Sequence, residues 1–403
     1  MFQGGFKMIH RHLSGKLADA ATRYPVVTLT GPRQSGKTTL VKHVFPEAEY
    51  LSLENPETRT FAINDPKDFL AQFDGPVILD EVQRVPDLLS YIQGIVDDNP
   101  EPGRFILTGS QNLLLLESVS QTLAGRTLFL TLLPFSNAEL CGNKIQLPGS
   151  GGFKLREKPP LRDDLFDVMW TGFYPRIHKE ELPPQEWLTS YIEAYIERDV
   201  RQMINIGDLE AFQLFLKICA GRCGQLLNLT SIGNDCGLSQ PTVRRWLSVL
   251  ETSFIVKRIE PYHNNFKKTL VKSPKLMFYD TGLLCNLLNI GSKDDLRIHS
   301  SRGAIFENFI VMEVFKNMVH SMVRPRIYHW RDRNHHEIDM IIEIDNKMIP
   351  VEIKSGKTIN QDFFKELLYW RQNIDSECDP ILAYGGDSVQ QRSGVQVAPW
   401  WQF

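Results

Sequence analysis

One stretch near the N-terminus constrains the fold of this chain more than any other. Residues 26–45 read VVTLTGPRQSGKTTLVKHVF: a short β-branched run, then Gly31, four residues, Gly36, Lys37 and Thr38, and then a helical pattern. A strand, a glycine-rich loop and a helix in this order form a P-loop, whose backbone N–H groups and helix N-terminus bind phosphates. The sequence therefore predicts an α/β domain with a parallel sheet and a nucleotide site.

The P-loop motif assigns roles to individual side chains. Lys37 would reach the β- and γ-phosphates of ATP, and the Thr38 hydroxyl would bind Mg²⁺. A later apolar run, RFILTG, ends before a polar stretch in which Gln111 or Asn112 would sense the γ-phosphate. The residues that we expect to contact ATP are Gly31, Pro32, Arg33, Gln34, Ser35, Gly36, Lys37, Thr38, Thr39 and Gln111.

Two acids, Asp80 and Glu81, end another apolar run, PVILDEVQR. An acid at the C-terminal tip of a strand beside a P-loop holds the Mg²⁺ shell, and the next acid polarises the attacking water. We therefore expect Asp80 to be a metal ligand, together with Thr38, and Glu81 to be the catalytic base.

Arg126 stands directly before a further strand, TLFLTLLP. At this position it would either stabilise the phosphate charge in a neighbouring subunit, as an arginine finger does, or pair with a surface acid. The first alternative implies that the chain forms a homo-oligomer.

Composition limits the class of protein. The chain has 403 residues, of which 42% are hydrophobic, and this length predicts two or three domains. The six cysteines form no CxxC pair, which argues against a zinc site or a disulfide framework. No uncharged apolar run approaches the roughly 18 residues that span a bilayer, so we expect a cytoplasmic protein that does not enter a membrane. The net charge of −3 confines any binding of nucleic acid to a local patch.

Residues 229–259 have the look of a helix-turn-helix followed by a strand. A short helix from Ser231, a turn at Gly237, Ser239 as the N-cap and a second helix over Gln240–Leu250 fit the expected lengths and caps. Two strands joined by a loop follow and would form a wing. Between Val256 and Leu276 six Lys or Arg residues stand against one acid, which is the local positive charge that binds phosphates.

Two interpretations of this winged unit stay open. It would bind nucleic acid, with DNA favoured over RNA, or it would serve as a packing module or ATPase lid. In the first case Gln240 and Thr242 would face a groove, and the charged contacts would be Arg244, Arg245, Lys267, Lys268 and Lys272.

A second candidate site lies in the stretch HEIDMIIEIDNKMIPVEIK, residues 336–354. Its two halves read as strands around a two-residue turn at Asp345–Asn346, so Ile344 would pair with Lys347. With that register Asp339 lies opposite Glu352, and Lys354 points to the same face. Two carboxylates so close repel unless a cation or a shared proton separates them, which suggests a Mg²⁺ site.

Several phrases also resemble one prokaryotic family over nearly the whole chain: GPRQSGKTTL, LDEVQRVPDLL, LTGSQNLLL, LAGRTLFLTLLPFSNAEL and YDTGLL. This family joins an AAA-type P-loop ATPase to a C-terminal domain called DUF4143. The resemblance implies ATP binding and a C-terminal domain related to PD-(D/E)xK nucleases. It implies that Glu307, Asp339 and Glu352 hold Mg²⁺ and that Lys354 positions or activates the attacking water. The leading proline of the nuclease motif is absent, since Ile338 precedes Asp339.

These patterns predict four segments: an AAA-type ATPase domain at 8–140, a linker or excursion at 141–187, a helical and winged helix-turn-helix domain at 188–292, and a nuclease-like domain at 293–403. Two functions follow as alternatives. In the first, the nucleotide state controls a DNA-binding winged helix and a metal-dependent nuclease. In the second, the protein is an ATPase switch whose nuclease-like domain is catalytically inactive and only binds a partner.

Overall fold

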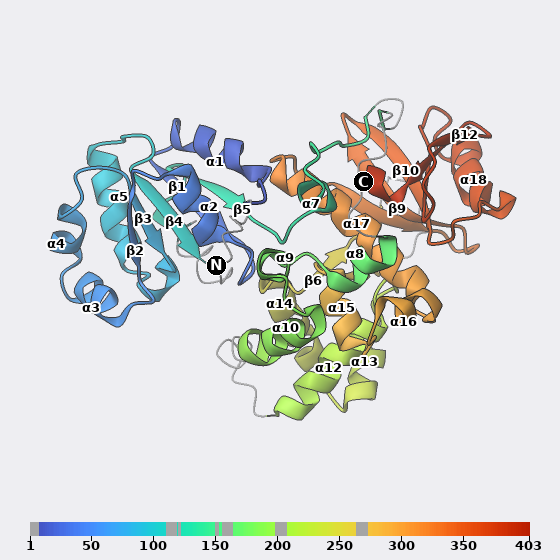
Figure 1. Cartoon of the computed structure of the whole chain (residues 1–403), viewed down its shortest axis with the longest axis horizontal. Coiled ribbons are helices and arrows are strands. Elements are labelled where there is room, and N and C mark those ends of the chain that lie inside the picture. Colours follow the sequence, from blue (N-terminus) through green and yellow to red (C-terminus); the bar gives the residue numbers. More distant parts are fainter. Residues whose placement is uncertain are drawn as a thin grey trace, which may run out of the picture.

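The computed structural model describes residues 8–109, 119, 122–149, 153–154, 164–197, 208–262 and 273–403. Figure 1 shows the arrangement: an N-terminal lobe at the left, a group of helices at the lower right and a C-terminal sheet region at the upper right. The N-terminal lobe carries the P-loop, and the other two regions pack against each other. The predicted α/β class is confirmed.

The N-terminal lobe is built on a parallel sheet of five strands in the order β2-β3-β4-β1-β5. Because all strands run the same way, their C-terminal ends meet at one edge of the sheet, where the P-loop follows β1. Strands β1, β3 and β4 are buried along their whole length, as central strands of a covered sheet are. The strands are β1 (Val26–Thr30), β2 (Glu49–Ser52), β3 (Val77–Asp80), β4 (Phe105–Gly109) and β5 (Thr127–Thr131).

Helices cover both faces of this sheet. Leucines of α1 and α2 pack on one face with Val27 and Ile106, and side chains of α3, α4 and α5 pack on the other with Val26 and Leu107. Neighbouring strand residues point to opposite faces, so each strand serves both cores. The helices are α1 (Leu13–Ala21), α2 (Lys37–Val44), α3 (Pro56–Asn64), α4 (Pro66–Ala71) and α5 (Leu88–Asp98).

The helical region begins earlier than the sequence predicts. Residues 141–187 were expected to be a linker, yet their described second half forms α8, α9 and the start of α10, and Met169 and Phe173 are buried in the following core. Prolines stand at the starts of α9 and α10, Pro175 and Pro184, where a helix tolerates them because the first turn lacks N–H partners. The helices are α7 (Asn137–Leu140), α8 (Leu165–Thr171), α9 (Pro175–Glu180), α10 (Pro184–Tyr191), a π-helical segment (Ile192–Glu197), α12 (Leu209–Gly221), α15 (Thr281–Leu287) and α16 (Lys293–Ile298).

The predicted helix-turn-helix is present as α13 (Leu229–Cys236) and α14 (Gln240–Thr252). Gly237 ends the first helix in the left-handed conformation, with φ of 67°, and the Ser239 side chain accepts from the Thr242 N–H at the start of the second. Strands β6 (Val256–Ile259) and β7 (Lys275–Phe278) then pair antiparallel. The tip of the predicted wing, residues 263–272, lies outside the described residues.

The C-terminal region is a mixed sheet of six strands in the order β12-β13-β11-β10-β9-β8. Helix α17 packs on one face and α18 on the other. The elements are α17 (Arg302–His320), β8 (Ile327–Arg331), β9 (Glu337–Ile344), β10 (Lys347–Lys354), a 3-10 turn (Gln361–Phe364), α18 (Lys365–Asn373), β11 (Ile381–Tyr384), β12 (Gln390–Arg392), β13 (Val395–Pro399) and a final 3-10 turn (Trp400–Gln402).

The predicted register of the β9–β10 hairpin is confirmed. Lys347 pairs with Ile344, and Val351 pairs with Met340. The turn residues Asp345 and Asn346 have φ of 51° and 60°, which is the left-handed pair that a two-residue hairpin turn requires. The regular ladder ends one pair before Asp339 and Glu352.

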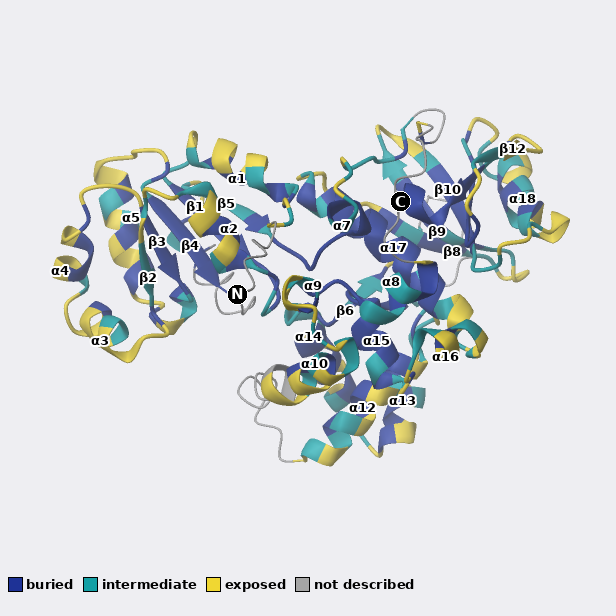
Figure 2. Ribbon diagram, viewed as in Figure 1, coloured by how far each residue is buried: buried dark blue, intermediate teal, exposed yellow. Residues whose placement is uncertain are grey.

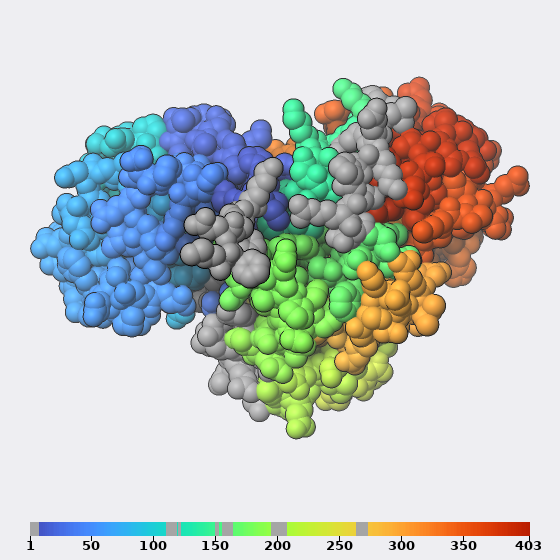
Figure 3. Space-filling model, in the orientation of Figure 1, coloured from blue at the N-terminus to red at the C-terminus, as the bar shows by residue number. Residues whose placement is uncertain are grey.

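One core joins the helical and C-terminal regions. It runs from Leu133 to Phe403 and includes buried residues of α12, α14, β7 and the C-terminal sheet. Helix α17 lies in the middle of it and is buried on nearly all sides, as the dark blue ribbon in Figure 2 shows. Residues 188–292 and 293–403 are therefore packed as one body, whereas the N-terminal lobe has cores of its own. Figure 3 shows the blue N-terminal lobe beside the green helices on one face of the molecule.

Candidate functional site

The P-loop holds its lysine inside the loop. The Lys37 ammonium donates to the carbonyl oxygens of Gly31 and Pro32 at 3.0 and 2.8 Å. A side chain at Gly31 would meet the Leu132 carbonyl oxygen at 2.1 Å, so this position admits only glycine. Burial lowers the pKa of Lys37 to about 8, and the nearby carboxylates of Glu81 and Asp80 counteract part of this shift. The ammonium therefore lies inside the loop, and its contact with the phosphates of ATP stays a prediction.

Asp80 lies beside the P-loop, and its carboxylate accepts hydrogen bonds from three hydroxyl groups on different elements. Its carboxylate accepts from the hydroxyls of Thr38 at 2.9 Å and Tyr50 at 2.7 Å, and also from Thr108. Thr38 and Asp80, the predicted Mg²⁺ ligands, are therefore in contact. Sequence reasoning missed Tyr50 and Thr108, because their role depends on β2 and β4 flanking β3.

The donor set at this point fits a nucleotide-bound magnesium ion. Mg²⁺ prefers oxygen ligands, and the Thr38 hydroxyl and the Asp80 carboxylate supply them next to the Lys37 ammonium. Burial, followed by the hydrogen bond to Asp80, raises the pKa of Tyr50, so its O–H remains a donor to this carboxylate.

Glu81, the predicted base, sits directly after β3 in the left-handed conformation, with φ of 59° and ψ of 43°. A residue other than glycine in this conformation stores roughly 1–3 kcal/mol of strain, and such strain concentrates at functional sites. Its carboxylate accepts from the side-chain amide of Gln83, a neighbour that the sequence did not single out. The predicted γ-phosphate sensor, Gln111, lies outside the described residues.

Arg126 lies away from the P-loop of its own chain. It precedes β5, and Thr127 pairs with Val26 at the start of β1, whereas the P-loop follows the far end of that strand. Its guanidinium pairs with Asp97, with one contact at 2.8 Å, and also donates to the Ala124 carbonyl at 3.0 Å. The surface-pair alternative therefore describes this residue within one chain, and a role in a neighbouring subunit stays a prediction.

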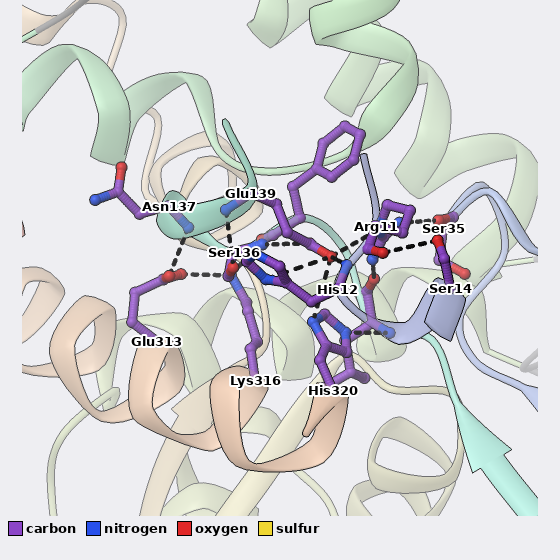
Figure 4. Close-up of polar contacts among 12 residues, drawn as sticks. Arg11, His12, Ser14, Ser35, Ser136, Asn137, Glu139, Glu313, Lys316 and His320 are labelled. Atoms are coloured by element: carbon purple, nitrogen blue, oxygen red, sulfur yellow. Dashed lines mark hydrogen bonds and ion pairs between the residues drawn. The ribbon is translucent and has the colours of Figure 1, made fainter. Parts of the chain in front are cut away.

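A buried polar network, which the sequence did not predict, lies behind the P-loop. The Arg11 guanidinium donates to the backbone carbonyls of Ser35 at 2.8 Å and Leu133 at 2.6 Å, and its Nε donates to Glu139 at 3.0 Å. Figure 4 shows Arg11, Glu139 and His320 directed toward one another between the N-terminal segments and α17. We call the set Arg11, Glu139, Glu313, Lys316 and His320 the interlobe network.

Glu139 is the centre of the interlobe network. Its carboxylate accepts from the backbone N–H groups of His12 at 2.8 Å and Ser136 at 3.0 Å, in addition to Arg11. Burial acts to raise the pKa of Glu139, but Arg11 and the surrounding donors outweigh burial and lower it to about 2. His320 lies 3.7 Å from this carboxylate and accepts from the Leu133 N–H at 3.2 Å, and burial lowers its pKa to about 3.

Helix α17 holds the chain segment that leaves β5. The Glu313 carboxylate accepts from the Asn137 N–H at 2.6 Å, and the Lys316 ammonium donates to the Phe135 carbonyl at 3.1 Å and to Glu313 at 2.9 Å. The network thus connects a P-loop carbonyl with a helix at the centre of the other two regions.

The β9–β10 hairpin brings together Asp339, Glu352 and Lys354. The Lys354 ammonium contacts Glu352 and lies 3.5 Å from Asp339, which also accepts from the Ile353 N–H at 2.8 Å. The second carboxylate oxygen of Glu352 is buried and finds no hydrogen-bond partner within the described part of the chain. Burial, followed by the charge of Asp339, raises the pKa of Glu352 to about 8 against the effect of Lys354.

Lys275 enters this site from β7, although the sequence counted it as part of the basic wing. Its ammonium donates to Glu307 at 2.8 Å, contacts Glu337 at 2.7 Å and lies 3.9 Å from Asp339. Only 3% of the residue is exposed, so it cannot contact nucleic acid. Burial raises the pKa of Glu307 to about 7, with Lys275 opposing and Asp339 adding to the shift. We call Lys275, Glu307, Glu337, Asp339, Glu352 and Lys354 the hairpin cluster.

The hairpin cluster does not fit a divalent metal as it is arranged. Among the described residues, no group of three or more His, Cys, Asp or Glu side chains is placed to hold a metal ion. Two lysine ammonium groups neutralise the carboxylates instead. The Mg²⁺ assignment of Glu307, Asp339 and Glu352 therefore disagrees with the position of Lys275, a second ammonium group beside the expected Lys354.

The helix-turn-helix leaves a smaller basic surface than the sequence suggests. Arg244 and Arg245 are exposed on α14, as predicted. Arg258 pairs with Glu251 at 2.6 Å, and Lys275 is buried in the hairpin cluster, so two of the six counted cations are committed to acids. Lys267, Lys268 and Lys272 lie outside the described residues.

Family models match three consecutive parts of the chain. An AAA domain matches residues 23–141, a domain of unknown function (DUF8612) matches 162–294, and a domain of unknown function (DUF4143) matches 302–403. The first and third matches confirm the predicted P-loop ATPase domain and the predicted C-terminal domain. The second match covers the helical region and includes part of the segment that was expected to be a linker.

An uncharacterized protein of Mycobacterium tuberculosis is 30% identical, covering 86% of this chain and 74% of its own length, and one of Haemophilus influenzae is 23% identical, covering 64% and 68%. The Walker-type ATPase of Pyrococcus abyssi covers 70% of this chain and 96% of its own at 14% identity and a TM-score of 0.44. AMPPCP-bound DnaA of Aquifex aeolicus covers 59% and 85% at 16% identity and a TM-score of 0.28. Across the described ranges, no helix has both the length and the apolar character needed to cross a membrane.

Proposed function

We propose that this chain, which belongs to the prokaryotic family that joins an AAA-type P-loop ATPase domain to a C-terminal DUF4143 domain, is an ATP-driven switch that acts on nucleic acid. ATP binding and hydrolysis at the P-loop would change how the N-terminal lobe is held against α17. That change would control the helix-turn-helix and the C-terminal region, which move together because they share one core.

The P-loop residues would divide the work as follows. The Lys37 ammonium would exchange its two loop carbonyls for phosphate oxygens, and Thr38 and Asp80 would hold Mg²⁺. Bound magnesium would neutralise charge on the phosphates. Glu81 would accept the proton of the attacking water, for which its position after β3 is suited.

The observation that carries the switch proposal is the Arg11 contact. One guanidinium donates to the P-loop carbonyl of Ser35 and also to Leu133 and Glu139, in the segment that α17 holds. A shift of the P-loop backbone on nucleotide binding would therefore change a buried contact with the rest of the molecule. Such a contact has two ends that nucleotide and nucleic acid could each bias, as coupling between sites requires.

Nucleic acid is the proposed ligand of the switched region. Helix α14 is the second helix of the helix-turn-helix, the one that enters the major groove in proteins of this type, and it exposes Arg244 and Arg245. Changing both to Glu should weaken binding of duplex DNA at low salt, because charge reversal repels phosphates. Unaltered affinity would favour the packing interpretation of the same unit.

Binding of a fluorescent duplex tests the switch directly. Its affinity would be measured with ATP, with ADP and without nucleotide for the wild type, Lys37→Ala, Glu81→Gln and Arg11→Lys. Lys37→Ala should lose ATP binding, and Glu81→Gln should bind ATP, lose hydrolysis and stay at the ATP-bound affinity. Arg11→Lys should still bind ATP but lose most of the difference between the ATP and ADP states. Equal wild-type affinities in all three conditions would contradict the proposal.

A metal-dependent nuclease is the second candidate. It is favoured by one observation, the gathering of Asp339, Glu352 and Lys354 on one hairpin. Labelled single-stranded, duplex and branched DNA, and RNA, would be incubated with Mg²⁺ or Mn²⁺, with and without ATP. Cleavage that is lost in both Asp339→Ala and Lys354→Ala would establish this activity, and intact substrates alongside normal ATP turnover would exclude it.

A further inference from the structure

A lysine stands where a cation is needed in the hairpin cluster. The Lys275 ammonium lies within hydrogen-bonding distance of Glu307 and Glu337, at 2.8 and 2.7 Å, and 3.9 Å from Asp339. An ammonium has three donors and no acceptor, so it satisfies several carboxylates in the way that a small bound cation does. These acids come from α17 and β9, and the lysine comes from a different region of the chain.

The backbone that carries Lys275 is fixed on both sides. The Leu276 carbonyl accepts from the Gly224 N–H at 2.8 Å, and the Pro274 carbonyl accepts from the Leu227 N–H at 2.8 Å. The side-chain amide of Asn308 on α17 bonds to both the N–H and the carbonyl of Phe278, at 2.7 and 3.0 Å. The strand that carries Lys275 is therefore tied both to residues 224–227 and to α17, which places the start of its side chain beside the cluster.

The charges around Lys275 are nearly balanced without a metal. Arg331 lies 3.6 Å from Glu337, and Lys354 contacts Glu352 and Asp339. Four carboxylates therefore face three cationic side chains, and among the described residues the buried second oxygen of Glu352 has no hydrogen-bond donor. A divalent ion added to this set would lie close to the Lys275 ammonium and be repelled by it.

We propose that Lys275 is a resident cation that replaces a divalent metal ion among Glu307, Glu337 and Asp339, so that the C-terminal region binds neither Mg²⁺ nor Mn²⁺ at this cluster. The carboxylates that could bind a metal ion are present, but the positive charge between them comes from the Lys275 ammonium. This inference is independent of the ATP switch, because it concerns only the hairpin cluster, and it opposes the second candidate function, since a metal-dependent nuclease needs a divalent ion at these carboxylates. It accounts for why the cluster offers no set of acids free to hold a metal.

Mn²⁺ titration followed by electron paramagnetic resonance tests this proposal on the full chain. Asp80→Asn would be used as the background without nucleotide, so that the P-loop site does not contribute. Adding Asp339→Asn to the Asp80→Asn protein should leave the amount of bound Mn²⁺ unchanged. Adding Lys275→Met instead should create about one Mn²⁺ site per chain, because three carboxylates then lack their cation and hard oxygen ligands suit this ion. Lys275→Arg, which keeps the charge, should create none.

Two results would overturn the proposal. The first is Mn²⁺ bound to the Asp80→Asn protein and lost with Asp339→Asn, since the lysine would then not exclude the metal. The second is a folded Lys275→Met protein that binds no Mn²⁺. Melting temperature supplies a separate readout, which should rise with Mn²⁺ in Lys275→Met and stay constant with Lys275 present. If Lys275→Met does not fold, Mn²⁺ binding by Asp80→Asn and by Asp80→Asn/Asp339→Asn still tests the proposal.

Discussion

The interlobe network and the hairpin cluster are both buried groups of charges, yet their carboxylates behave in opposite ways. Glu139 receives Arg11 and two backbone N–H groups, and its pKa falls to about 2. Glu352 receives one lysine, faces Asp339 and has one oxygen that no described residue bonds, and its pKa rises to about 8. Both carboxylates are buried, so the hydrogen-bond donors and charges around each one decide whether its pKa falls or rises.

This difference suggests different roles for the two groups: the interlobe network connects two parts of the molecule, and the hairpin cluster has the character of a binding or reactive site. The Glu139 carboxylate accepts hydrogen bonds from Arg11 and from two backbone N–H groups, and so it helps to hold the lobes together. Such a contact suits the transmission of movement between them. Acids crowded so that their pKa values rise are typical of places that bind or react, although structural ion pairs produce shifts too. The comparison predicts that mutations in the interlobe network should destabilise the protein, whereas neutralising Glu352 should stabilise it.

The largest effect is expected for Arg11→Met, which tests the interlobe side of the comparison. It leaves Glu139 buried without its main partner, and breaking a buried ion pair in this way costs roughly 3–5 kcal/mol of unfolding free energy. Denaturant unfolding of the full chain measures it, with Glu139→Gln as the matched control and with Arg11→Met/Glu139→Gln as the double variant. The double variant should lose less unfolding free energy than the two single variants lose together. A loss equal to or greater than that sum would show that Arg11 and Glu139 act separately.

The second prediction concerns pH. His320 has a pKa of about 3 in the fold against 6.5 when exposed, so the unfolded chain binds its proton first as pH falls. Stability contributed by the neutral histidine is therefore complete above pH 6.5 and is lost as pH falls below it. Between pH 6.5 and 4.5 this loss should be roughly 2–3 kcal/mol. Unfolding free energies of wild type and His320→Gln across this range check it, and parallel curves would show that His320 contributes no slope.

Glu352→Gln should have a smaller effect of the opposite sign. The pKa of Glu352 is raised from 4.5 to about 8, so the folded protein holds the proton longer and stability falls as pH rises through this window. The neutral amide removes that loss but also gives up the ion pair with Lys354, so it should stabilise the protein by only about 1–2 kcal/mol at pH 8, well below what the full shift would give. Unfolding at pH 5 and pH 8 measures it, with Glu343→Gln on the neighbouring strand β9 as the control. A variant destabilised at both pH values would show that the Glu352 charge is well accommodated.

The contrast between the two groups also marks how far the sequence could lead. The P-loop, the helix-turn-helix and the hairpin register follow from local pattern, because turn residues such as Asp345 and Asn346 have only a few allowed conformations. The partners of Lys275 and Arg11 depend on distant segments, with Arg11 and Glu139 separated by 128 positions. A charged residue in a sequence looks the same whether it meets phosphates or a buried acid, so the basic wing was overestimated and the interlobe network was missed.

The smallest effect is expected for Arg126, whose exposed pair with Asp97 is the reference for charges outside both buried groups. Solvent and salt screen such a pair, so Arg126→Ala should leave the melting temperature of the protein nearly unchanged. ATP turnover measured over a range of protein concentrations separates the two remaining interpretations of this residue. If Arg126 acts on a neighbouring subunit, wild-type turnover per chain should rise with concentration and that of Arg126→Ala should not. Turnover that is identical in both proteins at every concentration would leave Arg126 as a surface residue, and the catalytic charge would then come from the P-loop side alone.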